Sequence, residues 1–224
     1  MSSTPTFPSA IAREQINDLP LARYEGPVTV IGDPREVPAA VDYLRHETLL
    51  GFDTESRPSF RRGDNYPVSL LQIAGSERVF LFQLLQLQDL AQVYALLADR
   101  AIRKAGVAIR DDIRKLQDLH PLEPGNFVEI SDLSRRLEVS NTGLRSLCAI
   151  FLGFRVSKGA QVTNWALPKL SPTQIAYAAT DAWVSRLLYL KLAEFGQPVA
   201  EFRPAQRPAH DDRRSPDDRG RHDD

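Results

Sequence analysis

Two pairs of polar residues, far apart in the chain, constrain its fold more than any other feature. Asp53 and Glu55 stand two residues apart in a predicted strand, so their side chains point to the same side of a sheet. Tyr177 and Asp181 stand four residues apart in a predicted helix, which places the phenol and the carboxylate on one face, one turn apart. Convergent carboxylates repel one another unless a cation holds them, and hard divalent ions bind oxygen ligands. We therefore expect three carboxylates and a phenol that could converge on one point.

Hydrophobic periodicity divides the chain into short strands and helices. The predicted strands are residues 28–31, 49–55, 68–73, 79–82, 103–109 and 127–130, and the predicted helices are residues 9–19, 35–47, 87–99, 111–119, 144–152 and 171–194. The strands within residues 49–82 should form an antiparallel meander, with a turn at residues 75–78. The last helix begins with a capping box at residues 171–174. This pattern predicts an α/β domain with a mixed central sheet flanked by helices.

Composition divides the chain into three parts. Residues 1–27 are predicted to be an N-terminal arm, residues 28–202 the folded domain, and residues 203–224 a disordered charged tail. Because arginines and aspartates balance in the tail, we expect a solubilising or incidental segment; a tail that contacts RNA is the alternative. The 42% hydrophobic content of the whole chain suits one domain with a sizeable core.

The single cysteine and the charge balance bound the class of protein. Cys148 lies in an apolar run, so we expect a buried core thiol rather than a nucleophile, and no intramolecular disulfide is possible. A reducing, cytoplasmic location is the expectation, with no secretory signal and no membrane-spanning run. The net charge of −1 does not mark a nucleic-acid binder. Most of the cations are arginines, which pair well with phosphate, although an arginine-rich coding bias is an equal explanation.

A further carboxylate is predicted to join the first three. Asp111 and Asp112 open the helix that follows the strand at 103–109, and either could be an N-cap. Asp112 shares its helical stripe with Leu116, on the buried side, whereas Asp111 shares its stripe with Lys115, on the solvent side. Asp112 is therefore expected to point inward. The alternative for each acidic residue is an ordinary solvated charge at the end of a strand or on a helix.

Four carboxylates in one pocket have a specific chemical use. Two divalent ions about 4 Å apart can bind both the attacking and the leaving oxygen of a phosphodiester displacement, and can lower the pKa of a bound water. A nearby tyrosine oxygen can orient that water. Mg²⁺ or Mn²⁺ suits an all-oxygen site, and Zn²⁺ fits less well because the four histidines show no ligand spacing.

The motifs in this order resemble those of the DEDDy-type 3′–5′ exonuclease family, which includes RNase D and the Werner-syndrome exonuclease domain. The resemblance is carried by residues 52–55 (Phe-Asp-Thr-Glu), 106–112 (Gly-Val-Ala-Ile-Arg-Asp-Asp) and 177–181 (Tyr-Ala-Ala-Thr-Asp), supported by residues 143–147, 152–153, 164–166 and 170–174. It covers about residues 28–192. The motifs depart from the family at Asp111, where glycine is common, so an extra carboxylate lies beside the site.

The resemblance implies the fold and the roles of the site residues. The implied fold is the RNase H-like exonuclease fold. The implied metal ligands are Asp53, Glu55, Asp112 and Asp181, of which Asp53 bridges two ions and Asp112 acts through water. Tyr177 would position the attacking water, the feature that defines the tyrosine subclass.

Substrate contacts are predicted in two loops. Residues 56–63 follow the acidic strand directly and combine basic and aromatic side chains, including Arg57, Phe60, Arg61 and Arg62, which suits phosphate contact and base stacking. The alternative is a solvated loop with Phe60 in the core. Lys158 and Gln161, in a glycine-containing loop before the last helix, are further candidates.

Together these patterns predict a metal-dependent 3′–5′ exonuclease. The expected partners are 3′ ends of single-stranded or frayed RNA or DNA, and the resemblance implies nucleoside 5′-monophosphate products. Two rival hypotheses are a catalytically weak nucleic-acid-binding adaptor and a small-nucleotide phosphodiesterase. Activity on dinucleotides but not on longer strands would favour the phosphodiesterase.

Overall fold

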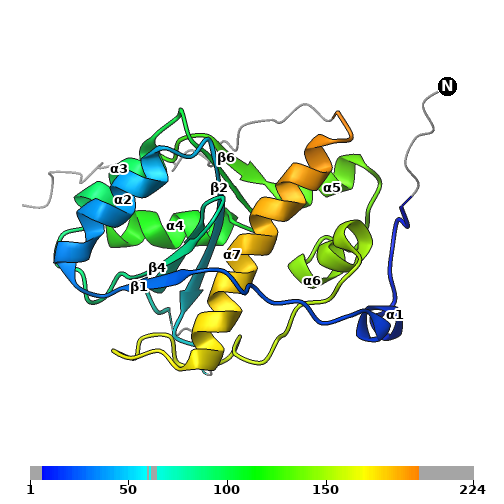
Figure 1. The fold of residues 1–224 in the computed structure, drawn as a ribbon, viewed down its shortest axis with the longest axis horizontal. Helices are drawn as coiled ribbons and strands as arrows, with labels where there is room; N and C mark the ends of the chain where they lie inside the picture. The colour runs from blue at the N-terminus through cyan, green and yellow to red at the C-terminus, as the bar shows by residue number, and fades with distance from the viewer. Residues whose placement is uncertain (1–6, 60, 62–64, 197–224) are drawn as a thin grey trace, which may run out of the picture.

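A six-stranded sheet forms the centre of the fold, which a computed structural model describes for residues 7–59, 61 and 65–196 (Figure 1). The strands are β1 (Val28–Ile31), β2 (Leu49–Ser56), β3 (Val68–Ala74), β4 (Val79–Gln83), β5 (Arg103–Gly106) and β6 (Phe127–Glu129), in the spatial order β1-β4-β3-β2-β5-β6. β2, β3 and β4 form the predicted antiparallel meander, β1 runs parallel to β4, and β5 and β6 continue parallel beside β2. The prediction of a mixed sheet is confirmed.

Helices cover both faces of this sheet. The helices are α1 (Arg13–Asp18), α2 (Val37–Arg45), α3 (Ala91–Ala98), α4 (Arg110–Leu119), α5 (Ile130–Arg136), α6 (Leu144–Leu147) and α7 (Pro172–Ala193), with shorter turns η1 (Pro34–Glu36) and η2 (Cys148–Leu152). α2, α3 and α4 share one hydrophobic cluster with the sheet, and α7 packs on the opposite face (Figure 1). Among the described residues, no helix is long and apolar enough to cross a membrane.

The alternation of β2 decides which side chains meet α7. Leu50 and Phe52 are fully buried in the cluster that contains α2, α3 and α4, so Gly51, Asp53 and Glu55 face the other side. Gly51 allows α7 to approach closely, because a Cβ at this position would lie 2.0 Å from the carbonyl oxygen of Ala182. A strand of small and acidic residues therefore lies directly beneath the helix that carries Tyr177 and Asp181.

Several predicted elements are shorter in the structure, and two of them show a local reason. The strand predicted at residues 103–109 ends at Gly106, because Ala108 takes a left-handed conformation with φ 61° and turns the chain into α4. The helix predicted at residues 144–152 is α6 followed by the wider turn η2, and it ends at Gly153 with φ 73°. Cys148 lies in η2 and is fully buried, where desolvation raises its pKa, as expected of a core thiol.

The N-terminal arm docks on the domain along its described part, from residue 7 onward. Ile16 of α1 is buried. Farther along, Leu21 forms a parallel bridge with Arg155, and the Ala22 amide donates a hydrogen bond of 2.9 Å to the carbonyl oxygen of Arg155. The Tyr24 amide then donates to the Thr180 hydroxyl of α7 at 3.0 Å. The arm thus crosses α7 before it enters β1 (Figure 1). The predicted tail at residues 203–224 lies outside the described residues.

Candidate active site

Asp53 and Glu55 of β2 meet Tyr177 and Asp181 of α7 at one cavity. Asp53, Glu55 and Asp181 each offer a carboxylate oxygen, and these three oxygens lie within 4.8 Å of one another. The predicted capping box stabilises the N-terminus of α7. The Gln174 amide donates to the Ser171 hydroxyl at 3.2 Å, and the Ser171 amide donates to the Gln174 side-chain oxygen at 3.0 Å. Small residues on the sheet-facing side of α7, among them Ala178 and Ala182, allow the close approach that brings Asp181 over β2. The predicted convergence of these three carboxylates is confirmed.

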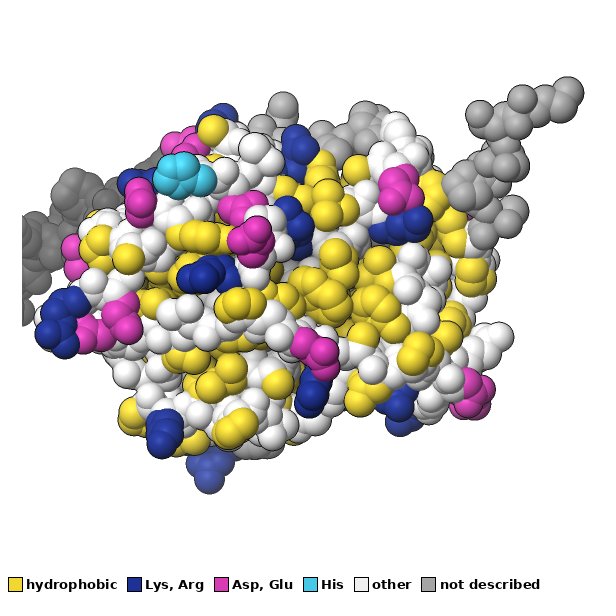
Figure 2. Space-filling view, in the orientation of Figure 1, with side chains coloured by type: hydrophobic (Ala, Val, Ile, Leu, Met, Phe, Trp, Pro, Cys, Tyr) yellow, Lys and Arg dark blue, Asp and Glu magenta, His cyan; other side chains and the backbone are white. Residues whose placement is uncertain are grey.

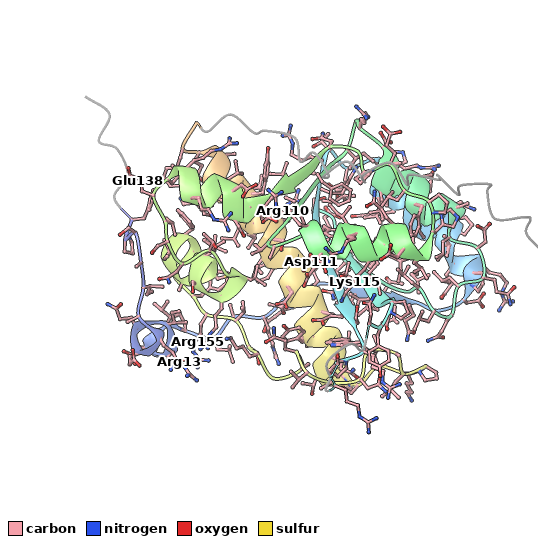
Figure 3. All side chains as sticks on the ribbon, turned by 180° about the vertical axis from the view of Figure 1, so that it is seen from behind. Arg13, Arg110, Asp111, Lys115, Glu138 and Arg155 are labelled. Atoms are coloured by element: carbon pink, nitrogen blue, oxygen red, sulfur yellow. The ribbon has the colours of Figure 1, made fainter. Side chains whose placement is uncertain are left out.

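Asp112 lies next to this group rather than inside it. Its Oδ1 accepts a hydrogen bond of 2.6 Å from the Thr54 hydroxyl, which fixes the start of α4 against β2. Asp111 lies on the exposed side of α4 and pairs with Arg114 at 3.0 Å. In the view from behind, Asp111 and Lys115 lie along α4 (Figure 3). The helical phase therefore identified the inward-pointing aspartate correctly.

The pKa values of the clustered carboxyl groups are strongly raised. Burial, followed by the charges of Asp181 and Asp112, raises the pKa of Asp53 well above its usual range. Burial and the same two charges raise the pKa of Glu55 to about 9, although Lys115 opposes the shift. Burial likewise raises the pKa of Asp112 to about 6 and that of Asp181 to about 7. Like charges held together in a desolvated site repel one another, and a bound cation would stabilise their ionised form.

Tyr177 supplies a proton donor at the edge of this group. Its hydroxyl hydrogen-bonds Asp181, which lowers the pKa of that carboxyl and partly offsets the effect of burial. Burial, with the negative charges of Asp181 and Glu55, raises the pKa of the Tyr177 phenol, so the group remains protonated at neutral pH. The ring also contacts the buried Trp165, with ring centroids 5.9 Å apart, which holds the phenol in place.

The donors present fit a divalent metal ion. All three clustered ligand groups are carboxylates, which hard cations such as Mg²⁺ and Mn²⁺ prefer. Asp181 is only 4% exposed, and its buried Oδ1 has no hydrogen-bond partner among the described residues. Burying such an acceptor without a partner is costly, and a metal ion would satisfy it.

The acidic group opens into a cavity of about 290 Å³ that we call the catalytic cavity, between β2, α6 and α7. Of the two further residues predicted to contact the substrate, Gln161 lines this cavity, whereas Lys158 is exposed and outside the lining. Arg57 and Arg61 are both exposed in the loop after β2, and the Arg57 guanidinium lies 4.8 Å from the centre of the Tyr66 ring. The predicted contacts at Phe60 and Arg62 lie outside the described residues.

One supporting residue was missed by the sequence analysis. Glu129, at the end of β6, is 5% exposed and accepts hydrogen bonds of 2.8 Å from the amides of Ala108 and Ile109. These bonds hold the left-handed turn that aims α4, and therefore Asp112, at the acidic group. The signal was a glutamate within an otherwise apolar strand, since a buried charge requires hydrogen-bond partners.

Comparisons with known proteins show the family of this chain. A family model described as 3′–5′ exonuclease matches residues 28–196. The mouse protein "Bifunctional 3'-5' exonuclease/ATP-dependent helicase WRN" is 31% identical over 160 residues, covering 69% of this chain and 11% of that protein. The chain spans less than two thirds of the length of the first curated relatives it matches.

Solved structures share the fold. The Nibbler EXO domain of Aedes aegypti superposes with a TM-score of 0.71 at 21% identity, covering 78% of this chain and 92% of that one. RNase D of Trypanosoma brucei, solved in complex with RNA U12, gives a TM-score of 0.68 at 20% identity, covering 82% of this chain and 76% of that one. The central sheet and its flanking helices are thus the RNase H-like arrangement of exonuclease domains, as the sequence analysis expected.

Proposed function

This chain belongs to the 3′–5′ exonuclease family, and on that premise we propose that it is itself a metal-dependent 3′–5′ exonuclease. One observation carries the proposal: Asp53, Glu55 and Asp181 place three carboxylate oxygens within 4.8 Å of one another, inside the region that the family model matches. The substrates we propose are the 3′ ends of single-stranded or frayed RNA or DNA, which are released as nucleoside 5′-monophosphates. The RNA bound to the trypanosomal RNase D supports a nucleic-acid substrate.

We assign the binding of two divalent ions, Mg²⁺ or Mn²⁺, to the four carboxylates. Asp53, Glu55 and Asp181 would hold them directly, whereas Asp112, outside that group and fixed by the Thr54 hydroxyl, would act through water. When bound, such ions neutralise the phosphate charge and stabilise the charge that develops on the attacking and leaving oxygens. Asp111 is excluded from this set because its carboxylate pairs with Arg114 on the exposed side of α4.

The remaining residues orient the reactants. The protonated phenol of Tyr177 lines the catalytic cavity beside Asp181, where it can hold the attacking water by a hydrogen bond. Gln161 lines the same cavity and can bond the substrate's sugar or phosphate. Arg57 and Arg61, both exposed where the chain leaves β2, are placed to pair with the backbone phosphates of the incoming strand.

The decisive experiment uses matched 5′-labelled single strands of RNA and DNA with Mg²⁺ or Mn²⁺. We expect the wild type to produce a ladder that shortens from the 3′ end, and Asp53→Ala to leave both strands intact. The relative rates on the two strands report the sugar preference. Intact strands with every metal would contradict the proposal; retained strand binding would then identify an adaptor, and cleavage of dinucleotides alone a small-nucleotide phosphodiesterase.

A further inference from the structure

A second cavity of about 340 Å³ lies beside the catalytic cavity, on the side of α7 that the arm crosses. Its walls include Leu21 and Ala22 of the arm, Ser157 and Ala160 of the loop before α7, and Thr173 and Ala176 of α7. Tyr177 and Asp181 line both cavities, so the two adjoin at the candidate catalytic residues. We propose that this second cavity, which we call the arm cavity, is a subsite for a substrate nucleobase; the proposal rests on the proposed exonuclease function.

The wall contributed by the arm is preformed. The amides of Ala22 and Arg155 donate hydrogen bonds of 2.9 Å to the carbonyls of Arg155 and Pro20, respectively, and the Tyr24 amide bonds Thr180 on α7. Ligand binding therefore does not have to pay the entropy of ordering this segment. The arm also precedes residue 28, where the match to the family model begins, so this wall is a feature of the chain outside the matched region.

The lining contains one cation, Arg23, which pairs with the exposed Glu25 at 3.5 Å. The rest of the lining favours a base rather than a phosphate. The alanines at positions 22, 160 and 176 present small apolar surfaces, and Leu21 adds a larger apolar side chain that is 55% exposed. On the face shown in Figure 2, hydrophobic side chains gather around the crossing of the arm and α7. The hydroxyls of Ser157 and Thr173 can bond the polar edge of a base, while the apolar surfaces accept its face.

The position of the arm cavity next to the catalytic cavity indicates its occupant. We place the phosphate of the nucleotide against the carboxylates and its base in the arm cavity, because Tyr177 and Asp181 line both cavities. The cavity volume of about 340 Å³ falls within the range for pockets that bury small organic groups. The arm cavity therefore suits the base of a nucleotide that flanks the scissile phosphate.

The test fills the cavity without touching a carboxylate. In Ala22→Phe the new ring should occupy the arm cavity and raise KM for a labelled oligonucleotide roughly tenfold, the loss expected for one base stack. Hydrolysis of bis(p-nitrophenyl) phosphate, which has no base, should remain as in wild type. Leu21→Ala provides a milder second variant, and Leu85→Ala, at another exposed leucine outside both linings, is its matched control.

Abasic substrates make the test specific. For the wild type, removing the base at one position near the 3′ end should also raise KM roughly tenfold. For Ala22→Phe, removing the base at that position should not raise KM further, whereas removal at other positions should. The proposal would be overturned by an unchanged KM in Ala22→Phe. It would also be overturned if the KM increases from the substitution and from base removal added to each other at every abasic position.

A parallel readout separates this inference from the proposed function. Fluorescence anisotropy of a labelled trinucleotide in EDTA reports binding without turnover. If wild type cleaves nothing but Ala22→Phe still weakens trinucleotide binding, the exonuclease assignment fails and the subsite stands. If wild type cleaves strands and Ala22→Phe leaves the anisotropy unchanged, the subsite fails and the exonuclease stands.

Discussion

Tyr177 and Asp181 divide two tasks over a single helical turn. The carboxylate is a candidate metal ligand, whereas the phenol is a proton donor whose pKa is raised by burial and nearby negative charge. Removing only the hydroxyl should therefore separate the tasks. In Tyr177→Phe we expect Mn²⁺ affinity to change little and kcat to fall roughly a hundredfold, since the ring stays in contact with Trp165.

Titration calorimetry with Mn²⁺ and turnover on a labelled strand measure the two effects. Asp181→Ala is the comparison, and it should lose both metal binding and activity. Equal turnover in Tyr177→Phe and wild type would exclude the role assigned to the phenol.

The adjacent aspartates of α4 offer a matched pair of variants. Asp112 accepts a hydrogen bond from the Thr54 hydroxyl and faces the acidic group, whereas Asp111 forms an ion pair with the exposed Arg114. Asp112→Asn should lower kcat/KM by at least a hundredfold, on the order of the loss of one preorganised electrostatic contact. Asp111→Asn should stay within about twofold of wild type, because exposed ion pairs contribute little. A larger loss in Asp111→Asn than in Asp112→Asn would reverse the assignment.

At the scale of elements, the contact between β2 and α7 decides whether the site exists. A Cβ at Gly51 would meet the carbonyl oxygen of Ala182 at 2.0 Å and the amide nitrogen of Arg186 at 2.9 Å, both of them backbone atoms that cannot rotate away. Gly51→Ala should therefore cost about 1–3 kcal/mol of unfolding free energy through overpacking, and shift Asp181 away from Asp53.

Thermal unfolding and Mn²⁺ titration report these two consequences. We expect Tm to fall by several degrees and metal affinity to weaken. Gly143→Ala is the control for stability, because a Cβ there meets nothing within 4 Å and the native φ of −76° suits any residue. Equal Tm values for the two variants would show that the helix can move without cost.

The whole molecule carries a stability cost that depends on pH. In the metal-free protein, burial raises the pKa of Asp181 from 3.8 to about 7 and that of Asp112 from 3.8 to about 6. The native state therefore holds protons that the unfolded chain has already released. The stability from these groups is fully present below about pH 4 and is lost as the pH rises through 6 and 7.

Metal ions should reverse this loss, because they bind the ionised carboxylates. Between pH 5 and 8 we expect Tm in EDTA to fall, and the increase in Tm produced by Mn²⁺ to grow with pH. Differential scanning calorimetry measures both trends. Asp53→Ala should remove most of the Mn²⁺ effect, and a Mn²⁺ effect that shrinks as pH rises would contradict the predicted site.

Several features of the site could be predicted because they depend on local periodicity. The two-residue spacing of Asp53 and Glu55 fixes a shared face of any strand, and the helical phase that selects Asp112 over Asp111 holds in any helix. The capping box at the start of α7 is likewise written in four consecutive residues and is present in the structure. These features could be predicted because each depends on the geometry of a single element.

Contacts between elements could not be predicted from local periodicity. Several of these contacts join residues far apart in sequence. They include the order of strands in the sheet, the hydrogen bonds of Glu129 to the turn before α4, the approach of α7 to Gly51 and the wall that the arm adds beside Tyr177. Such contacts are selected by the packing free energy of the whole chain, in which many small terms compete and no short pattern dominates. The sequence by itself therefore determined which side chains could form the site, and the tertiary structure alone decided the distances between them and the cavities that surround them.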